Sequence, residues 1–121
     1  MAELLTPSQR GKPGYEGYLN KRVISIAEVF ETAGYFTCMA GKWHLGDEPN
    51  YIPNARGFQL TFSLLYGGAS HWKDMEGLFK NQTPAKYTLN GEPLEKLPED
   101  FYSSRSYTDF IMESIRENRD S

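Results

Sequence analysis

The chain has 121 residues, a formal net charge of -3 and 14% aromatic residues, which suffices for one domain with a hydrophobic core but not for two of ordinary size. Acidic and basic residues are interspersed, so the sequence lacks the basic stripe of a nucleic-acid binder. It also lacks an apolar run long enough to span a bilayer, and its single cysteine excludes an internal disulfide.

The first 22 residues are rich in glycine, proline and charge, which predicts an irregular leader before an α/β part at 23–121. We expect Tyr15, Tyr18 and Leu19 to anchor this leader on a surface elsewhere in the chain. The sequence leaves the cellular compartment open.

A short helix is predicted over residues 25–33. Ser25 and Glu28 have the spacing of a capping box, and apolar residues then recur at helical intervals. Gly34 stands where a glycine ends a helix. A helix that leads straight into a strand is half of a βαβ unit, and the strand that would precede it is not found in the sequence.

The run G-Y-F-T-C-M-A-G-K-W-H-L-G at 34–46 is the stretch around which we expect the chain to be organised. Its first half is apolar and β-prone, which predicts a strand covered on both faces. If extended geometry continues, Lys42 and His44 point to one side, and Trp43 and Leu45 pack on the other. A cation and an imidazole at the carboxyl end of a strand form a candidate anion site.

The second half of the chain contains weaker patterns. After a proline-bearing loop at 46–57, residues 58–66 predict a second strand that ends at a Gly-Gly pair, and 73–84 show no periodicity. Asn90-Gly91 indicates a hairpin over 86–94, and Pro93 confines its second arm to a sheet edge.

A final helix is predicted over 106–118. Its apolar stripe consists of Tyr107, Phe110, Ile111 and Ile115. Ser106 or Thr108 is the expected N-cap.

Lys42 and His44 support two interpretations from their spacing alone. An ammonium group suits a tetrahedral oxyanion such as sulfate or phosphate, and an imidazole can act as acid or base near neutral pH. The alternative is that Lys42 extends into solvent and His44 is a structural histidine.

Three other sites are not supported. Gly41-Lys42 lacks the upstream glycine and the following Ser or Thr of a phosphate-binding P-loop. His44, His71 and Cys38 are too few and too scattered for zinc. Cys38 lies among apolar residues, so we expect a small buried hydrophobic residue rather than a nucleophile.

The run at 34–46 resembles the second signature of the type I sulfatases, which ends in G-K-x-H. Similar resemblances to bacterial arylsulfatases occur at P-N-A-R-G-F (53–58), G-G-A-S-H (67–71), the hairpin (86–94) and L-P-E-D-F-Y-S-S (97–104). The leader, with G-K-P-G-Y-E-G at 11–17, resembles them too. The resemblance covers essentially the whole chain.

The resemblance implies roles for two residues. Lys42 matches the lysine that contacts the sulfate group and the catalytic aldehyde hydrate, and His44 matches the histidine that hydrogen-bonds this hydrate and helps to regenerate the aldehyde. Such enzymes use a formylglycine made within C-x-P-x-R or S-x-P-x-R, together with calcium. The chain contains neither motif nor the acidic residues that bind calcium in the family, so we assign it no metal ligands.

We therefore expect residues 1–121 to be an internal segment of a sulfatase, a partial mixed α/β sheet of the alkaline-phosphatase/sulfatase type with flanking helices. The parent would hydrolyse sulfuric (aryl) esters, whereas the segment alone would be inactive and would self-associate through its unpartnered strand. The alternative is a non-enzymatic module that self-associates or binds anions. His71 and Arg56 are left out of the catalytic set, Arg56 being expected to form a structural ion pair.

Overall fold

A four-stranded mixed sheet forms the centre of the computed structural model, which describes residues 7–9 and 11–119. The regular elements, in chain order, are η1 (Pro7–Gln9), α1 (Ile26–Thr32), β1 (Cys38–Lys42), η2 (Pro53–Arg56), β2 (Leu60–Leu64), η3 (Lys80–Gln82), β3 (Tyr87–Leu89), β4 (Glu92–Leu94) and α2 (Ser103–Asn118). The mixed α/β class expected from the sequence is confirmed.

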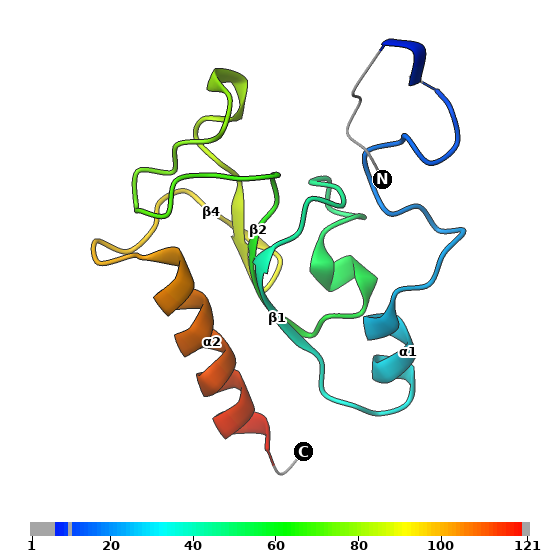
Figure 1. Ribbon diagram of the computed structural model, residues 1–121. Helices are drawn as coiled ribbons and strands as arrows, with labels where there is room; N and C mark the ends of the chain where they lie inside the picture. Colours follow the sequence, from blue (N-terminus) through cyan, green and yellow to red (C-terminus); the bar gives the residue numbers. More distant parts are fainter. Residues whose placement is uncertain (1–6, 10, 120–121) are drawn as a thin grey trace.

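The strands lie side by side in the order of the sequence. β1 pairs in parallel with β2, while β2 with β3 and β3 with β4 are antiparallel. α2 and α1 lie on opposite sides of this sheet (Figure 1). Because paired residues share a face, Lys42, Leu64 and Tyr87 all belong to one face.

The core lies between this face and α2. The Phe62 ring is the hub, since ring pairs join it to Phe101, Tyr107 and Phe110 at centroid distances of 6.0, 5.4 and 6.0 Å. Two residues of the predicted helical stripe, Tyr107 and Phe110, are therefore partly buried and pack against the core. The outer end of that stripe is open, because Ile115 is 51% exposed.

α2 begins at Ser103, three residues earlier than predicted. Its N-cap is Tyr102, which makes no side-chain cap hydrogen bond. The predicted caps are wrong: Ser106 donates its backbone N–H to Tyr102 O, and the Thr108 hydroxyl donates to Ser104 O inside the helix.

β1 also differs from its prediction. It starts at Cys38 rather than Tyr35, and Tyr35 is 61% exposed. The strand is only partly buried because it forms an edge of the sheet, so the expectation of cover on both faces is wrong. Apolar composition alone does not distinguish an edge strand from a central one.

The predicted α1 and hairpin are confirmed. The Ser25 hydroxyl accepts from Glu28 N, and the Glu28 carboxylate accepts from Ser25 N, which completes the capping box. The hairpin turn has positive φ at Asn90 (50°) and Gly91 (88°), as a two-residue turn of the predicted kind requires. β4 carries Pro93 and is the other edge of the sheet.

The leader is anchored by two of the three predicted residues. The Tyr18 ring stacks on Tyr51 with a centroid distance of 4.0 Å, and Leu19 N donates to Leu45 O at 2.9 Å. These contacts hold the leader against the loop that follows β1.

Candidate anion site at the end of β1

Lys42 is the last residue of β1 and is exposed. It lines a cavity of about 270 Å³ together with Gly67, Ser70 and His71. Within the described residues, nothing forms an ion pair or hydrogen bond with its ammonium group. The charge is therefore available to a ligand in that cavity.

His44 reaches the same neighbourhood by a different route from the one predicted. Extended geometry stops at Lys42, and His44 has a φ of 55° in the left-handed region that residues other than glycine seldom adopt. Its N–H donates to Leu65 O at 3.2 Å. The imidazole lies against Gly67, where an added Cβ would be 2.7 Å from His44 Cε1.

Gly67 relates the two predicted site residues, because it lines the Lys42 cavity and also contacts the His44 ring. Lys42 borders it in the cavity, and the His44 ring packs on it, although His44 is not itself among the residues lining the cavity. Gly68 is equally constrained, since a Cβ there would be 2.8 Å from Leu78 Cδ1. The sequence predicted the Gly-Gly pair only as the end of a strand. In the structure, the absence of side chains at Gly67 and Gly68 leaves room for the His44 ring and the Leu78 side chain.

Trp43 points away from this cavity, as predicted. Its indole Nε1 donates to Tyr51 O at 2.8 Å, and its ring meets Phe58 edge-on at 6.2 Å. Trp43 therefore ties the loop after β1 to the opposite side of the sheet.

His71, which sequence reasoning set aside, lies in the same cavity as Lys42. Its Nδ1 shares a hydrogen bond of 2.6 Å with Ser103 Oγ, and its carbonyl accepts from Ser103 N at 3.0 Å. Sequence patterns gave no reason to join a loop residue at 71 to the first residue of α2. Only the G-G-A-S-H run itself marked the loop.

Two tyrosines complete the inner wall of the cavity. Tyr87 is 2% exposed and Tyr107 is partly buried, and both line the cavity. Burial raises the pKa of both phenols, and hydrogen bonding to Tyr87 raises that of Tyr107 further. Both are therefore neutral hydroxyl groups at physiological pH, which add polarity without charge.

Two residues that sequence reasoning considered are placed outside the site. Arg56 is 4% exposed and pairs with Glu28 at 3.1 Å, which confirms its structural role. Cys38 is a half-buried free thiol whose pKa is raised by burial. Cys38 is therefore less buried than predicted, and a thiol with a raised pKa is a poor nucleophile.

The described residues do not offer a metal centre. Over 7–9 and 11–119, no group of three or more His, Cys, Asp or Glu side chains is placed to hold a metal ion. In the same part of the chain, the helices are too short or too polar to cross a membrane.

The fold and site define an α/β protein in which a lysine that pairs with no described residue and a histidine follow one another at the carboxyl end of an edge strand. An uncharacterized sulfatase of Schizosaccharomyces pombe is 42% identical over 111 residues, which are 88% of this chain and 20% of that protein. An arylsulfatase of Klebsiella aerogenes is 48% identical over 98 residues, or 80% of this chain and 21% of that protein.

Comparison of structures agrees with the sequence comparison. The crystal structure of Ps i-CgsB in complex with k-i-k-neocarrahexaose matches 76% of this chain and 23% of its own, with 26% identity and a TM-score of 0.55. No family model matches the chain. The chain belongs to the sulfatase family, as a segment that spans about one fifth of the length of the curated relatives named above.

Proposed function

We propose that this segment supplies Lys42 and His44 to a sulfate-ester site that other parts of a full-length sulfatase complete. The observation that carries the proposal is the exposed Lys42 ammonium in the cavity, which no described residue neutralises. The names of the relatives, sulfatase and arylsulfatase, support a sulfate ester as the substrate. Lys42 would contact the sulfate oxygens, and His44 would hydrogen-bond the hydrate of the catalytic aldehyde.

The strength expected of this site in isolation is small. A unit charge 4 Å from an anion contributes about 1 kcal/mol in bulk water and about 4 kcal/mol at the lower effective dielectric near a protein surface. Lys42 is exposed, so the lower end applies to the segment alone. A gain of about 1 kcal/mol corresponds to a Kd on the order of 10⁻¹ M, so we expect the isolated segment to bind sulfate much more weakly than millimolar.

Hydrolysis needs parts that the described residues do not provide. Cleavage of a sulfate ester requires a nucleophile and is assisted by a Lewis-acid metal. The described residues do not fit a calcium site, and the Cys38 thiol has a raised pKa. We propose that formylglycine and calcium belong to the remainder of the parent enzyme, and that the segment alone does not turn over an aryl sulfate.

Titration with inorganic sulfate tests the anion site. In ¹H–¹⁵N NMR spectra of the isolated chain, sulfate should shift the amides of residues 67–71 at constant ionic strength. Lys42→Ala should remove these shifts, whereas Lys96→Ala, which removes another exposed lysine, should keep them. Identical shifts in wild type and Lys42→Ala would overturn the assignment.

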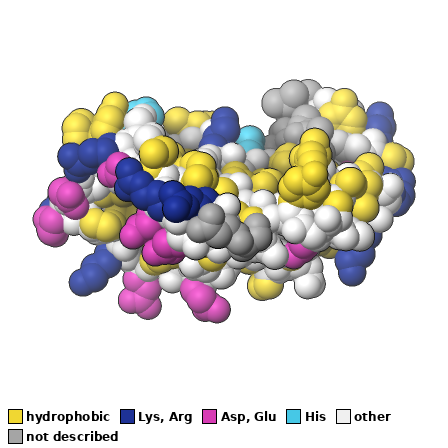
Figure 2. Space-filling view, turned by 90° about the horizontal axis from the view of Figure 1, so that it is seen from below, with side chains coloured by type: hydrophobic (Ala, Val, Ile, Leu, Met, Phe, Trp, Pro, Cys, Tyr) yellow, Lys and Arg dark blue, Asp and Glu magenta, His cyan; other side chains and the backbone are white. Residues whose placement is uncertain are grey.

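A second candidate, self-association, is favoured by one surface. Six apolar residues between 23 and 35 are 44–71% exposed, namely Val23, Ile24, Ile26, Val29, Phe30 and Tyr35. Figure 2 looks onto the lower end of the molecule, where hydrophobic side chains are open to view. This apolar surface and the edge strand β1 support pairing between copies of the chain.

Sedimentation velocity tests the second candidate. At micromolar concentration we expect species larger than the monomer, and Ile26→Asp should shift the distribution toward monomer because Ile26 is 71% exposed. A monomeric wild-type chain would rule out self-association without affecting the anion site.

A further inference from the structure

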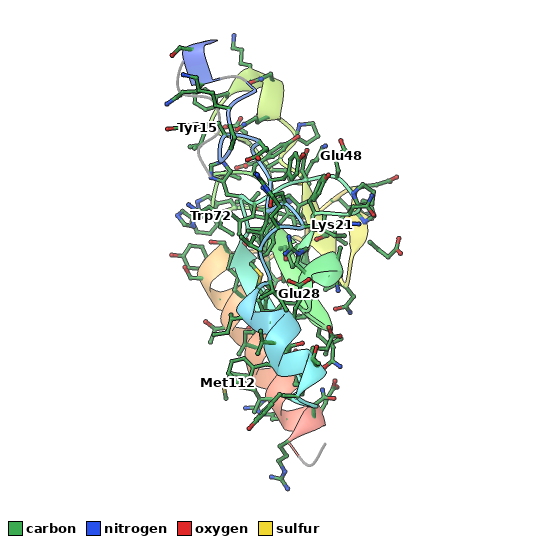
Figure 3. All side chains as sticks on the ribbon, turned by 90° about the vertical axis from the view of Figure 1, so that its right-hand side faces the viewer. Tyr15, Lys21, Glu28, Glu48, Trp72 and Met112 are labelled. Atoms are coloured by element: carbon green, nitrogen blue, oxygen red, sulfur yellow. The ribbon has the colours of Figure 1, made fainter. Side chains whose placement is uncertain are left out.

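Two exposed aromatic rings lie next to the Lys42 cavity. Trp72 is 60% exposed and Tyr102 is 39% exposed, and their ring centroids are 5.0 Å apart at an interplanar angle of 39°. Figure 3 shows Trp72 at the surface beside the start of α2. We call Trp72 and Tyr102 the aromatic pair.

Backbone hydrogen bonds hold the aromatic pair in place. An isolated antiparallel bridge joins Trp72 to Tyr102, and Trp72 N donates to Ser70 Oγ at 3.2 Å. On the neighbouring positions, His71 and Ser103 share the side-chain and backbone hydrogen bonds described above. The loop at 70–72 is thereby fixed to the first turn of α2.

The same contacts make the aromatic pair continuous with the cavity. His71 and Ser103 line the cavity that holds Lys42, and each is the direct chain neighbour of one ring of the pair. The His71 ring lies 6.1 Å from Tyr102. An anion at Lys42 would therefore have, past His71, a surface of aromatic rings rather than open solvent.

We propose that the aromatic pair is a stacking subsite for the organic part of a sulfate ester whose sulfate group lies at Lys42. The ligand chemistry is a flat apolar ring face, which either an aryl group or the apolar side of a sugar presents. Exposed tryptophan and tyrosine suit such faces because they offer large, rigid contact areas. This inference rests on the proposed function, since it takes the sulfate position from Lys42.

The chain carries its own reference for a test. It has two tryptophans, and the Trp43 indole is already engaged by Tyr51 O on the other side of the sheet. In ¹H–¹⁵N spectra of the full chain, phenyl sulfate should shift the Trp72 indole signal and leave the Trp43 signal in place. Methyl sulfate, which has no ring, should leave both signals unmoved.

A sulfated sugar separates the two sources of a ring face. Galactose 4-sulfate and phenyl sulfate are titrated in parallel, and a Trp72 shift with either supports the subsite and identifies the ring that it prefers. If neither moves Trp72, or if Trp43 moves equally, the proposal is overturned.

Variants keep this result separate from the outcome for Lys42. Tyr102→Ala should weaken the Trp72 response to phenyl sulfate about five- to tenfold, as loss of one aromatic partner predicts, whereas Tyr35→Ala, which removes a remote exposed aromatic residue, should not. In Lys42→Ala, phenol should still move Trp72. If sulfate shifts the amides of residues 67–71 equally in wild type and Lys42→Ala, the anion site is overturned and the subsite is not. If the Trp72 indole signal does not move with a ring-bearing ligand, the subsite is overturned and the anion site is not.

Discussion

Arg56 and Lys42 are two cations that lie 14 residues apart in the chain, and the fold treats them in opposite ways. Arg56 is 4% exposed and donates to the Glu28 carboxylate and to the carbonyls of Leu19 and Val23. Lys42 is exposed, and no described residue accepts a hydrogen bond from its ammonium group. The fold satisfies the first cation internally, whereas no described residue neutralises the second.

This difference in hydrogen bonding distinguishes a charged side chain that the fold depends on from one that the fold does not use. Arg56 is surrounded by acceptors from three parts of the chain, so its loss would leave a carboxylate and several carbonyls without partners. Loss of Lys42 would leave no described residue without a hydrogen-bond or ion-pair partner. The following predictions test this contrast, from the largest expected effect to the smallest.

Arg56→Met should be the most damaging substitution. Removing one partner of a buried ion pair typically costs about 3–5 kcal/mol of unfolding free energy, measured here by urea denaturation. Arg105→Met is the control, because the Arg105–Asp100 pair is exposed and should contribute less than about 0.5 kcal/mol. Equal losses in the two variants would contradict the structural role of Arg56.

Gly57→Ala should be the next most damaging. Gly57 has a φ of 89°, and an added Cβ would lie 2.3 Å from Glu28 N, so the substitution combines backbone strain with a clash against α1. We expect a loss of about 3 kcal/mol. Gly34→Ala has a similar φ of 84° with nothing within 4 Å and should cost about 1 kcal/mol; the difference isolates the clash.

Acid should weaken the Arg56 cluster specifically. The hydrogen bond from Arg56, followed by that from Ser25 N, lowers the pKa of Glu28 below its ordinary value of 4.5. A lowered native pKa gives stability that is complete above the unfolded value and is lost as pH falls through the native one. Thermal unfolding followed below pH 4.5 should therefore show a steeper decline for wild type than for Glu28→Gln. Parallel curves would exclude this contribution.

Lys42→Ala should have the smallest effect on folding. Because no described residue pairs with Lys42, its unfolding free energy should stay within about 0.5 kcal/mol of wild type. Loss of the sulfate response in that folded variant would complete the contrast with Arg56. A loss of stability like that of Arg56→Met would mean that Lys42 is structural.

Local sequence rules predicted the elements whose causes are local. The capping box at Ser25 and Glu28, the Asn90-Gly91 turn and the Pro93 edge all depend on residues within a few positions of one another. The existence of β1 and β2 also followed from composition. Their exposure did not, because whether a strand is central or at an edge depends on its neighbours in space.

The site was predicted only in part for the same reason. Lys42 was identified from its place at the end of a strand, but the cavity around it is lined by residues 42, 64, 67–71, 87, 103 and 107, which no periodicity connects. The Arg56 cluster likewise spans separations of 28–37 residues. Likeness to sulfatases suggested Lys42 and His44 as the residues to test, and tertiary contacts determine what surrounds them.

The left-handed backbone at His44 has a consequence for how its chemistry can be probed. A β-branched replacement would oppose the φ of 55°, so a folding defect could not be told apart from the loss of the imidazole. Asparagine adopts that backbone comparatively readily and does not titrate, so His44→Asn is the substitution that removes the imidazole while sparing the bend. The left-handed backbone at position 44 therefore limits which substitutions there can report on the imidazole rather than on folding.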